Sequence, residues 1–166
     1  SLFKDVDFVF HLAAESRIQN AIENPNRTIN VNLYGTINVL EASKKHKVKK
    51  IIYSSTSAYY GLENKPPHIE SMNRDCLNPY SVTKVAGEDM IKMYNKLYNL
   101  DAVIFRYFNV YGPGHRRNDY RILPNFIERG LKGKSLEVHN NGENTRSYCY
   151  INDAIEATFK VLFSKQ

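Results

Sequence analysis

The stretch "KKIIYSSTSAYYG", residues 49–61, decides the class of fold. Its apolar part, Ile51 to Tyr53, runs directly into a series of small, hydroxyl-bearing residues. A short apolar run with this kind of boundary is typical of a strand that ends in a polar loop. What the strand belongs to depends on the segments on either side of it.

The flanking segments alternate between strand and helix patterns. Upstream, "DVDFVFHLAA" (5–14) reads as a buried strand that enters a loop, and residues 30–46 carry apolar side chains at roughly helical spacing. Downstream, residues 80–98 have an apolar helical side, and "AVIF" (102–105) predicts another strand. Strand, helix, strand, helix, strand is the order of a parallel sheet with crossover helices. We therefore predict a three-layer α/β domain with a parallel sheet.

The last third of the chain continues with shorter elements. We expect a helix near 122–131 and then a strand and turn in "KSLEVHNNG" (134–142). A final helix is predicted over about 152–164, with Asp153 near its start.

The composition is that of an ordinary globular protein. The chain has 166 residues, 42% of them apolar, and its longest apolar runs are too short to span a membrane. Cys76 and Cys149 are far apart and in no metal or redox spacing, which favours a reduced, cytoplasmic protein without a metal site. The net charge of +6 suits either a nucleic acid or a phosphorylated small molecule. The densest basic run, "KKHKVKK" (44–50), is interpreted as the solvated end of a helix and the turn after it.

Small or polar segments follow all three predicted strands. They are "HLAAES" (11–16), "SSTSA" (54–58) and "RYFNVYG" (106–112). In open parallel sheets, ligands bind beyond the carboxyl ends of the strands. The three segments should therefore gather along one edge, near the start of the helix that contains Tyr80 and Lys84.

Tyr80 and Lys84 stand four residues apart in "PYSVTK" (79–84), on one face of a helix. A free tyrosine has a pKa near 10 and is a poor base at neutral pH, but a nearby cation favours the phenolate. Tyr80 could then take a proton from a sugar or alcohol hydroxyl while hydride leaves the same carbon. No side chain accepts a hydride, so this role requires a cofactor. The hydroxyl of Thr56 could bond the same substrate oxygen.

Each candidate also has a purely structural interpretation. Tyr80 can be a half-buried helix tyrosine with a solvated lysine beside it, and Thr56 can be a turn or helix N-cap residue. His11, at a strand end, is more often a satisfied core histidine than a catalyst. Arg106 can be a structural charge and Arg146 a surface charge.

The order of motifs narrows these alternatives. "FHLAA", "NLYGT", "SSTSAYYG", "YSVTK", "RYFNVYGPG" and "TRSYCYINDAIEA" follow one another in a single chain. This succession resembles the extended short-chain dehydrogenase/reductase family, in its NAD-dependent nucleotide-sugar epimerase/dehydratase branch, over nearly the whole sequence. The resemblance implies an α/β, Rossmann-like doubly wound parallel sheet that is incomplete, its N-terminal strands missing, with part of a small substrate-binding region. Residues 1–111 would form the second half of the NAD-binding domain, and residues 112–166 a partial substrate-binding region with a returning helix.

The resemblance also implies roles for particular residues. The catalytic set would be Thr56, Tyr80 and Lys84. The residues that contact NAD would be Leu12, Ala13, Ala14, Ser16, Asn32, Tyr80, Lys84 and Phe108. Those that contact the nucleotide-diphosphate sugar would be Thr56, Tyr80, Asn109 and Arg146, the last at the diphosphate. A basic edge of Arg116, Arg117 and Arg121 would suit the same charge, although these are interpreted first as surface residues.

The function implied is that of a nucleotide-sugar epimerase similar to UDP-glucose 4-epimerases. The protein would act as a cytoplasmic homodimer, with neither nucleic acid nor membrane as partner. In the family's dehydratases an Asp-Glu pair follows the active-site Thr; here Ser57 and Ala58 stand there, which disfavours dehydration. The related decarboxylases usually keep a Glu at the position of Ala58. A 4-keto reductase remains the first alternative, and a 4,6-dehydratase or decarboxylase the next.

One motif of the family has no counterpart. The first glycine is Gly35, and none of the eight glycines forms the Gly-x-x-Gly-x-x-Gly loop that holds the pyrophosphate. The sequence looks like a segment entered at about the fourth strand, and such a segment would be inactive alone. A non-catalytic binding fragment therefore stays open as a different class of function, as does a nucleic-acid binder that rests on net charge only.

Overall fold

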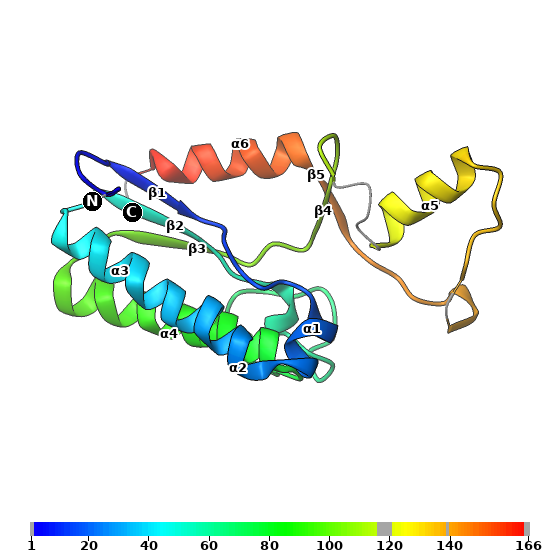
Figure 1. The fold of residues 1–166 in the computed structure, drawn as a ribbon, viewed down its shortest axis with the longest axis horizontal. Helices are drawn as coiled ribbons and strands as arrows, with labels where there is room; N and C mark the ends of the chain where they lie inside the picture. The colour runs from blue at the N-terminus through cyan, green and yellow to red at the C-terminus, as the bar shows by residue number, and fades with distance from the viewer. Residues whose placement is uncertain (1, 116–120, 139, 165–166) are drawn as a thin grey trace. The chain divides into compact units, whose positions relative to one another are not determined.

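The computed structural model describes residues 2–115, 121–138 and 140–164. The chain divides into two compact units, unit 1 with residues 1–107 and 161–166 and unit 2 with residues 108–160. Figure 1 labels the elements of both. The division falls close to the boundary expected at residue 111, and the roles expected of the two parts stay predictions.

Unit 1 contains a parallel sheet of three strands. They are β1 (Phe8–His11), β2 (Lys50–Ser54) and β3 (Ala102–Phe105), in the order β1-β2-β3. In the register, Val9 lies opposite Ile51 and Ile51 opposite Ala102. The central strand is the most buried, because it has a neighbour on each side and apolar side chains on both faces. The parallel sheet predicted from the sequence is confirmed.

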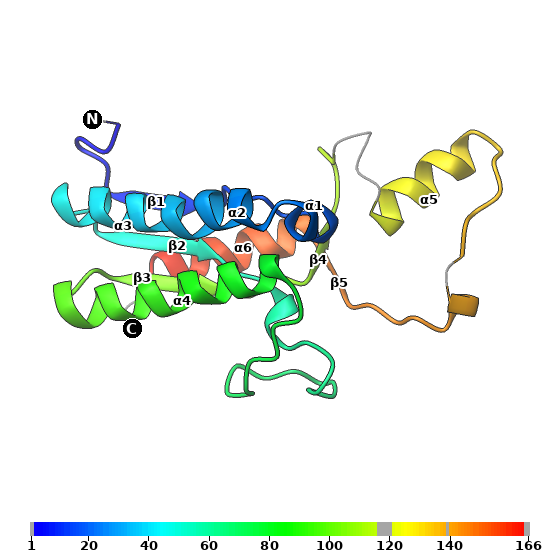
Figure 2. The same cartoon turned by 60° about the horizontal axis from the view of Figure 1, so that its bottom comes forward.

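Two long helices lie side by side against one face of this sheet, as Figures 1 and 2 both show: α3 (Gly35–Lys45) and α4 (Pro79–Tyr98). The apolar side of each helix faces the sheet. The buried cluster between them consists of Leu40, Val48, Ile51, Tyr53, Ile91, Tyr94 and Leu100. The predicted helix over 80–98 is confirmed to within one residue, whereas the segment 30–46 divides into a π-helix, η1 (Ile29–Tyr34), and α3.

The start of α4 is fixed by a capping box. The Asn78 side chain accepts a hydrogen bond from the Ser81 amide at 2.9 Å, and the Ser81 hydroxyl accepts one from the Asn78 amide at 3.3 Å. Pro79 occupies the first turn, where a missing N–H is tolerated. The helix ends at Asn99, which adopts a left-handed conformation with φ of 53°. This cap fixes the turn that carries Tyr80.

Two short helices follow β1 and were not predicted. They are α1 (Ile18–Glu23) and α2 (Pro25–Thr28), joined at Asn24, whose side chain accepts from the Arg27 amide at 3.0 Å. A 3₁₀ turn, η2 (Ser57–Tyr59), follows β2. Helices of fewer than two turns are too short to leave a clear period in the sequence.

Unit 2 pairs two short parallel strands, β4 (Asn109–Tyr111) and β5 (Tyr148–Tyr150). Its helices are α5 (Ile122–Leu131), η3 (Asn140–Gly142) and most of α6 (Ile151–Leu162). The strand predicted in 134–142 was wrong: residues 134–138 are irregular and exposed, because no described strand lies beside them to accept their backbone hydrogen bonds. The pairing of β4 with β5 was missed, since three residues carry little pattern.

The end of α6 returns to unit 1. The Phe163 ring packs edge-on against Phe8, with ring centroids 5.9 Å apart. The buried Lys50 ammonium donates to the Ser164 carbonyl at 2.9 Å and lies 3.3 Å from an Asp101 carboxylate oxygen.

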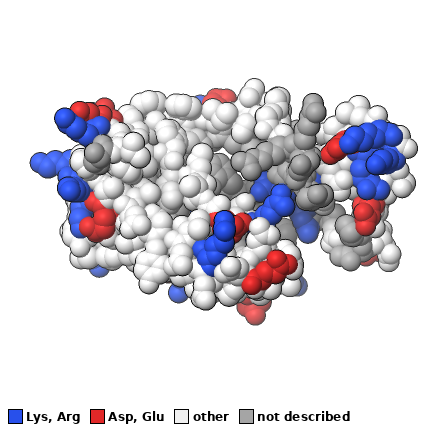
Figure 3. All heavy atoms as spheres, in the orientation of Figure 1, with Lys and Arg blue, Asp and Glu red and all other residues white. Residues whose placement is uncertain are grey.

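The basic run at 44–50 lies at the end of α3 and the start of β2. Its lysines face acids of the same unit: Lys44 is 2.7 Å from Glu41, and Lys49 is 3.1 Å from Asp7. Figure 3 shows basic and acidic spheres mixed at this end of α3. The interpretation as a solvated helix end and the turn after it holds for these two lysines but not for the buried Lys50. Among the described residues, no helix has the length and apolar content to cross a membrane.

Candidate functional site

The carboxyl ends of β1 and β2 lie next to each other, because His11 pairs in register with Tyr53. The loop 12–17 leaves β1 at this edge, and Ser55 and Thr56 follow β2 there. Both segments belong to unit 1, so the edge predicted for them is confirmed. The third segment, 106–112, enters unit 2 after Tyr107.

Lys84 is the most distinctive of the candidates because it is buried, with 3% of its surface exposed. Its ammonium nitrogen lies 4.4 Å from the centroid of the Tyr53 ring. Burial lowers the pKa of Lys84 to about 8, and the nearby Glu88 carboxylate acts in the opposite direction. The interpretation of Lys84 as a solvated neighbour of Tyr80 was therefore wrong.

Tyr80 is half-buried in the first turn of α4, one turn before Lys84. Its carbonyl accepts a hydrogen bond from the Thr83 hydroxyl at 2.9 Å. Thr56 is buried at the N-cap of η2, where its hydroxyl oxygen accepts from the Ala58 amide at 3.1 Å. The N-cap interpretation of Thr56 is thus confirmed. That oxygen keeps a proton to donate, and the meeting of the Thr56 and Tyr80 hydroxyls on one substrate oxygen stays a prediction.

Asn32 connects the loop after β1 to α4. It is buried inside the π-helix η1, and its amide oxygen accepts from the Glu15 backbone N–H at 2.8 Å. Its amide nitrogen donates to the Glu15 carbonyl at 3.1 Å and to the Thr83 hydroxyl at 3.0 Å. All the polar atoms of this amide are engaged in positioning. Single π-helical turns occur frequently at functional sites, and Asn32 lies within one here.

His11 is a buried histidine whose ring is hydrogen-bonded, so the structural interpretation of this residue is confirmed. The Thr36 hydroxyl donates to the Asn32 carbonyl at 2.6 Å, so its oxygen is left to accept from His11 Nε2 at 2.9 Å. Burial, and then the charge of Lys84, lowers the pKa of His11 to about 4. The imidazole is therefore neutral at neutral pH and carries its proton on Nε2.

A buried ion pair beneath the site was missed by the sequence analysis. Glu88, with 1% of its surface exposed, accepts from Arg106 Nε at 3.0 Å and Nη2 at 2.8 Å, and also from the Ser55 hydroxyl. The Arg106 guanidinium stacks on the Tyr59 ring, 3.4 Å from its centroid. This pairing raises the pKa of Arg106. The available signal was Glu88 itself, an acid one turn after Lys84 on the buried side of the helix.

The other candidates lie in unit 2. The Asn109 amide donates to the Ser147 carbonyl at 2.9 Å, and Phe108 is 39% exposed. Arg146 is exposed and donates to the Thr145 carbonyl at 2.7 Å. Arg121 precedes α5, whereas the other two members of the expected basic edge, Arg116 and Arg117, lie outside the described residues. The roles expected for these residues stay predictions.

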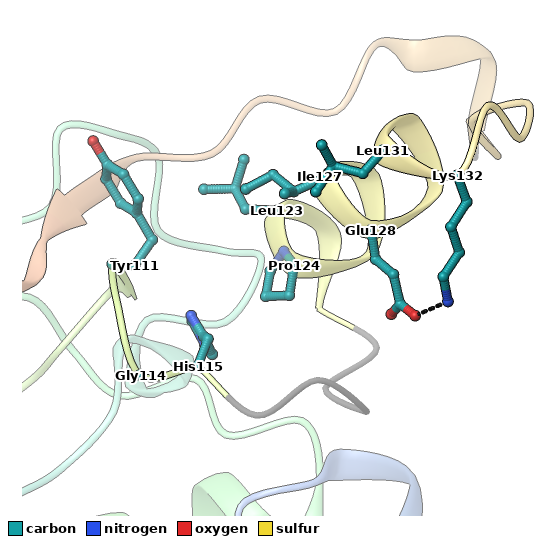
Figure 4. A pocket seen from close by; sticks show the side chains of 10 residues that line it. Tyr111, Gly114, His115, Leu123, Pro124, Ile127, Glu128, Leu131 and Lys132 are labelled. Atoms are coloured by element: carbon teal, nitrogen blue, oxygen red, sulfur yellow. Dashed lines mark hydrogen bonds and ion pairs between the residues drawn. The ribbon is translucent and has the colours of Figure 1, made fainter.

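Unit 2 also contains a pocket of about 490 Å³. As Figure 4 shows, Tyr111 and His115 lie on one side of it, and α5 contributes Leu123 and Ile127 on the other. Glu128 and Lys132 form an ion pair at its rim. The lining is mostly apolar, and the pocket falls within the region expected to bind substrate.

The residues of unit 1 suit the nicotinamide end of a dinucleotide better than its diphosphate. The loop 12–17 is held in place by Asn32 and exposes Leu12, Ala13 and Ser16. A phenol and a buried cation lie nearby on α4. The chain has no glycine-rich turn for the diphosphate, since none of its eight glycines forms that pattern. Among the described residues, no group of three or more metal-ligating side chains converges.

Comparison with known proteins identifies the family. The model of the NAD dependent epimerase/dehydratase family matches residues 1–166. A curated relative, the putative UDP-glucose 4-epimerase of Methanocaldococcus jannaschii, is 37% identical over 162 residues, which are 96% of this chain and 53% of the relative.

Solved structures agree with this match. The UDP-N-acetylglucosamine 4-epimerase of Methanobrevibacter ruminantium, in complex with UDP-N-acetylmuramic acid, superimposes with a TM-score of 0.96 at 34% identity, over 99% of this chain and 54% of that one. The UDP-glucuronic acid 4-epimerase of Bacillus cereus, in complex with UDP-glucuronic acid and NAD, gives 0.91 at 34% identity, over 99% and 52%. The chain spans about half the length of the relatives it matches. Its fold is Rossmann-like, and the chain belongs to the NAD-dependent epimerase/dehydratase family.

Proposed function

We propose that the whole protein is an NAD-dependent epimerase of a nucleotide-diphosphate sugar, similar to UDP-glucose 4-epimerases. The observation that carries the proposal is the position of Lys84. It is buried one turn after Tyr80, at the strand edge where Asn32 holds the loop 12–17. Family membership and the 4-epimerases among the relatives support the same reaction class.

In this proposal each side chain has one task. Tyr80 removes the proton from a sugar hydroxyl, and the Lys84 ammonium favours the phenolate that must form first. Thr56 donates a hydrogen bond to the same sugar oxygen and holds it toward Tyr80. Bound NAD supplies a reversible hydride acceptor for the sugar carbon. Tyr80 returns the proton after the keto-sugar has presented its other face.

Epimerisation fits these residues better than elimination of water does. Elimination needs an acid and a base close to the sugar carbon that loses its hydroxyl. Ser57 and Ala58, which follow Thr56, carry no carboxyl group. A 4-keto reductase would use the same Tyr80 and Lys84 and is separated from an epimerase only by the fate of the keto-sugar.

The proposal is tested with Tyr80→Phe in the whole protein. Turnover of nucleotide sugars should fall by about 100-fold or more, because a general base contributes at least that much. Nucleotide-sugar binding should remain, since most binding contacts lie away from the reacting hydroxyl. Tyr98→Phe is the matched control: it makes the same change near the other end of α4, roughly 27 Å away at 1.5 Å per residue.

Two outcomes would contradict the base role of Tyr80. One is turnover of the Tyr80→Phe protein within about threefold of the parent, since a general base contributes far more than that. The other is an equal loss in the Tyr98→Phe control, which would trace the effect to the helix and not to the phenol.

A homodimer in the cytoplasm belongs to the same proposal. The outer side of α4 supports self-association, because Val82 is 51% exposed and Leu97 is 62% exposed. Light scattering of the whole protein after size-exclusion chromatography should give twice the mass of one chain. A monomeric mass at working concentration would contradict it.

A further inference from the structure

The ring of Tyr53 forms one wall of the Lys84 environment. Tyr53 belongs to the central strand β2 and has no exposed surface. Its ring centroid lies 4.4 Å from the Lys84 ammonium, and its hydroxyl donates to the Lys84 carbonyl at 3.1 Å. Burial raises the pKa of Tyr53, so the phenol keeps the proton that it donates. One residue therefore contacts both the backbone and the charged end of Lys84.

The backbone of α4 leaves room for this contact only because residue 87 is glycine. A Cβ at Gly87 would lie 2.2 Å from the Tyr53 hydroxyl oxygen and 2.8 Å from the adjacent ring carbon. No side chain tolerates such distances. The phenol of Tyr53 thus occupies the surface of α4 that a side chain at Gly87 would fill, three residues after Lys84.

Few other groups can compensate the buried charge. His11 on β1 feels the charge of Lys84 but is itself neutral at neutral pH, so it cannot compensate that charge. Glu88 on α4 favours the charged form of Lys84 from one turn away, yet both its oxygens already bind Arg106 from the end of β3. Tyr80 on α4 is the group that Lys84 is proposed to serve. The ring face of Tyr53 is the contact that the structure places directly against the ammonium.

We propose that Tyr53 is a positioning residue for the reaction: its ring face keeps the Lys84 ammonium protonated and in place beside Tyr80, while its hydroxyl fixes the turn of α4 that carries Lys84. The catalytic part of this inference rests on the proposed function. The face of an aromatic ring is negative and attracts a cation most strongly when water is absent. Because burial brings the pKa of Lys84 down to about 8, a modest loss of this attraction changes its charge near neutral pH.

The experiment replaces Tyr53 in the whole protein by Tyr53→Phe and then by phenylalanines with one, two and three ring fluorines. Fluorine withdraws charge from the ring face and changes its shape little. The pKa of Lys84 is measured by NMR from the ¹³Cε resonance of labelled lysine, assigned with a Lys84→Arg variant. Lys50, a buried lysine paired with Asp101, is the internal reference.

We expect the pKa of Lys84 to be nearly unchanged in Tyr53→Phe and to fall stepwise with fluorination, by about one unit in total. At a fixed pH, the ¹³Cε chemical shift of Lys50 should be the same in all variants. An unchanged Lys84 titration across the series would overturn the role of the ring face. So would a full fall already in Tyr53→Phe, since the hydroxyl would then be responsible.

Failure of the inference and failure of the proposed function give different results. The NMR titration requires no turnover, so it tests the effect of Tyr53 on Lys84 directly. If the pKa of Lys84 falls with fluorination, the alkaline limb of the pH dependence of turnover, where Lys84 loses its proton, should shift to lower pH by the same amount. If the Lys84 titration shifts while the pH dependence of turnover stays fixed, the effect of Tyr53 on Lys84 is confirmed. The role of Lys84 as the cation of the reaction is then refuted.

Discussion

At the scale of single residues, the site is marked by ionisable groups held out of water. Burial lowers the pKa of Lys84 to about 8 and that of His11 to about 4. Each shift means that the folded state disfavours the charged form. Buried groups with strongly shifted pKa values are common at functional sites, and here the two residues lie near each other at one strand edge. Both shifts make the stability of the protein depend on pH.

The first prediction concerns acid unfolding and His11. Its pKa is about 4 when folded against 6.5 when unfolded, so between these values the unfolded chain binds more protons. The stabilisation from a neutral His11 is complete above pH 6.5 and is lost as the pH falls toward 4, by up to about 3 kcal/mol. Urea unfolding at several pH values should show this slope, and His11→Asn should remove most of it. An equal slope in the variant would refute the assignment to His11.

The second prediction is that Lys84→Met stabilises the protein while abolishing activity. Lys84 has a pKa of about 8 when folded and 10.5 when unfolded, so below pH 8 the full penalty of burying its charge is present. Removing the charge should raise the free energy of unfolding at pH 7 by about 1–3 kcal/mol. The gain should shrink toward pH 10, because the parent then loses the proton from Lys84 on folding. A variant less stable than the parent at pH 7 would show that the contacts of the ammonium outweigh its burial.

At the scale of elements, a buried ion pair adds to the apolar packing between β3 and α4. Glu88 on α4 binds Arg106, which follows β3, through two hydrogen bonds, and Ser55 after β2 joins them. The pair thereby links the ends of two strands to the helix that carries Tyr80 and Lys84. A buried pair of this kind adds little net stability, but its separation leaves a buried charge without a partner.

The third prediction follows from that asymmetry. Arg106→Met should lower the free energy of unfolding by about 3–5 kcal/mol, because the Glu88 carboxylate is left buried. The double variant Glu88→Met, Arg106→Met should recover much of the loss. Both values come from urea unfolding at pH 7. If the double variant were as unstable as the single one, lost packing and not the stranded charge would be the cause.

The sequence predicted those elements whose signal is local and repeated. The apolar side of α4 repeats along a helix of 20 residues, and the helix was placed to within one residue. The order of strands and helices was enough for the parallel sheet. Elements that depend on a distant partner were predicted poorly. The strand β4 was missed, because it exists only through its pairing with β5. A strand was wrongly predicted at 134–138, where no described strand lies beside the segment.

In the site, too, the sequence predicted only what depends on residues close together in the chain. Spacing alone put Lys84 beside Tyr80, because residues four apart share a helix face. The burial of Lys84, its contact with Tyr53 and the pairing of Glu88 with Arg106 all cross from one element to another. Such contacts are fixed by how α4 lies on the sheet, which periodicity does not specify.

At the scale of the whole molecule, the chain has the residues proposed for the nicotinamide end of a dinucleotide but not those that hold its diphosphate. In the proposed function, the edge formed by β1, β2 and α4 receives the nicotinamide end of NAD. The chain has no glycine-rich turn for the diphosphate, and it spans about half of relatives such as the Bacillus cereus enzyme, whose structure contains NAD. In the three-stranded sheet, the outer edge of β1 pairs with no described strand, and such an edge favours self-association.

The last prediction is that residues 1–166, produced alone, bind NAD weakly and show no epimerase activity. The diphosphate of a dinucleotide is normally held by backbone N–H groups at a helix N-terminus after a glycine-rich turn. Without them only the contacts near Tyr80, Lys84 and the loop 12–17 remain. Isothermal titration with NAD is the measurement, with the whole protein as the positive control. Micromolar binding by residues 1–166 would mean that another segment of this chain holds the diphosphate, and the glycine-rich turn would then be dispensable.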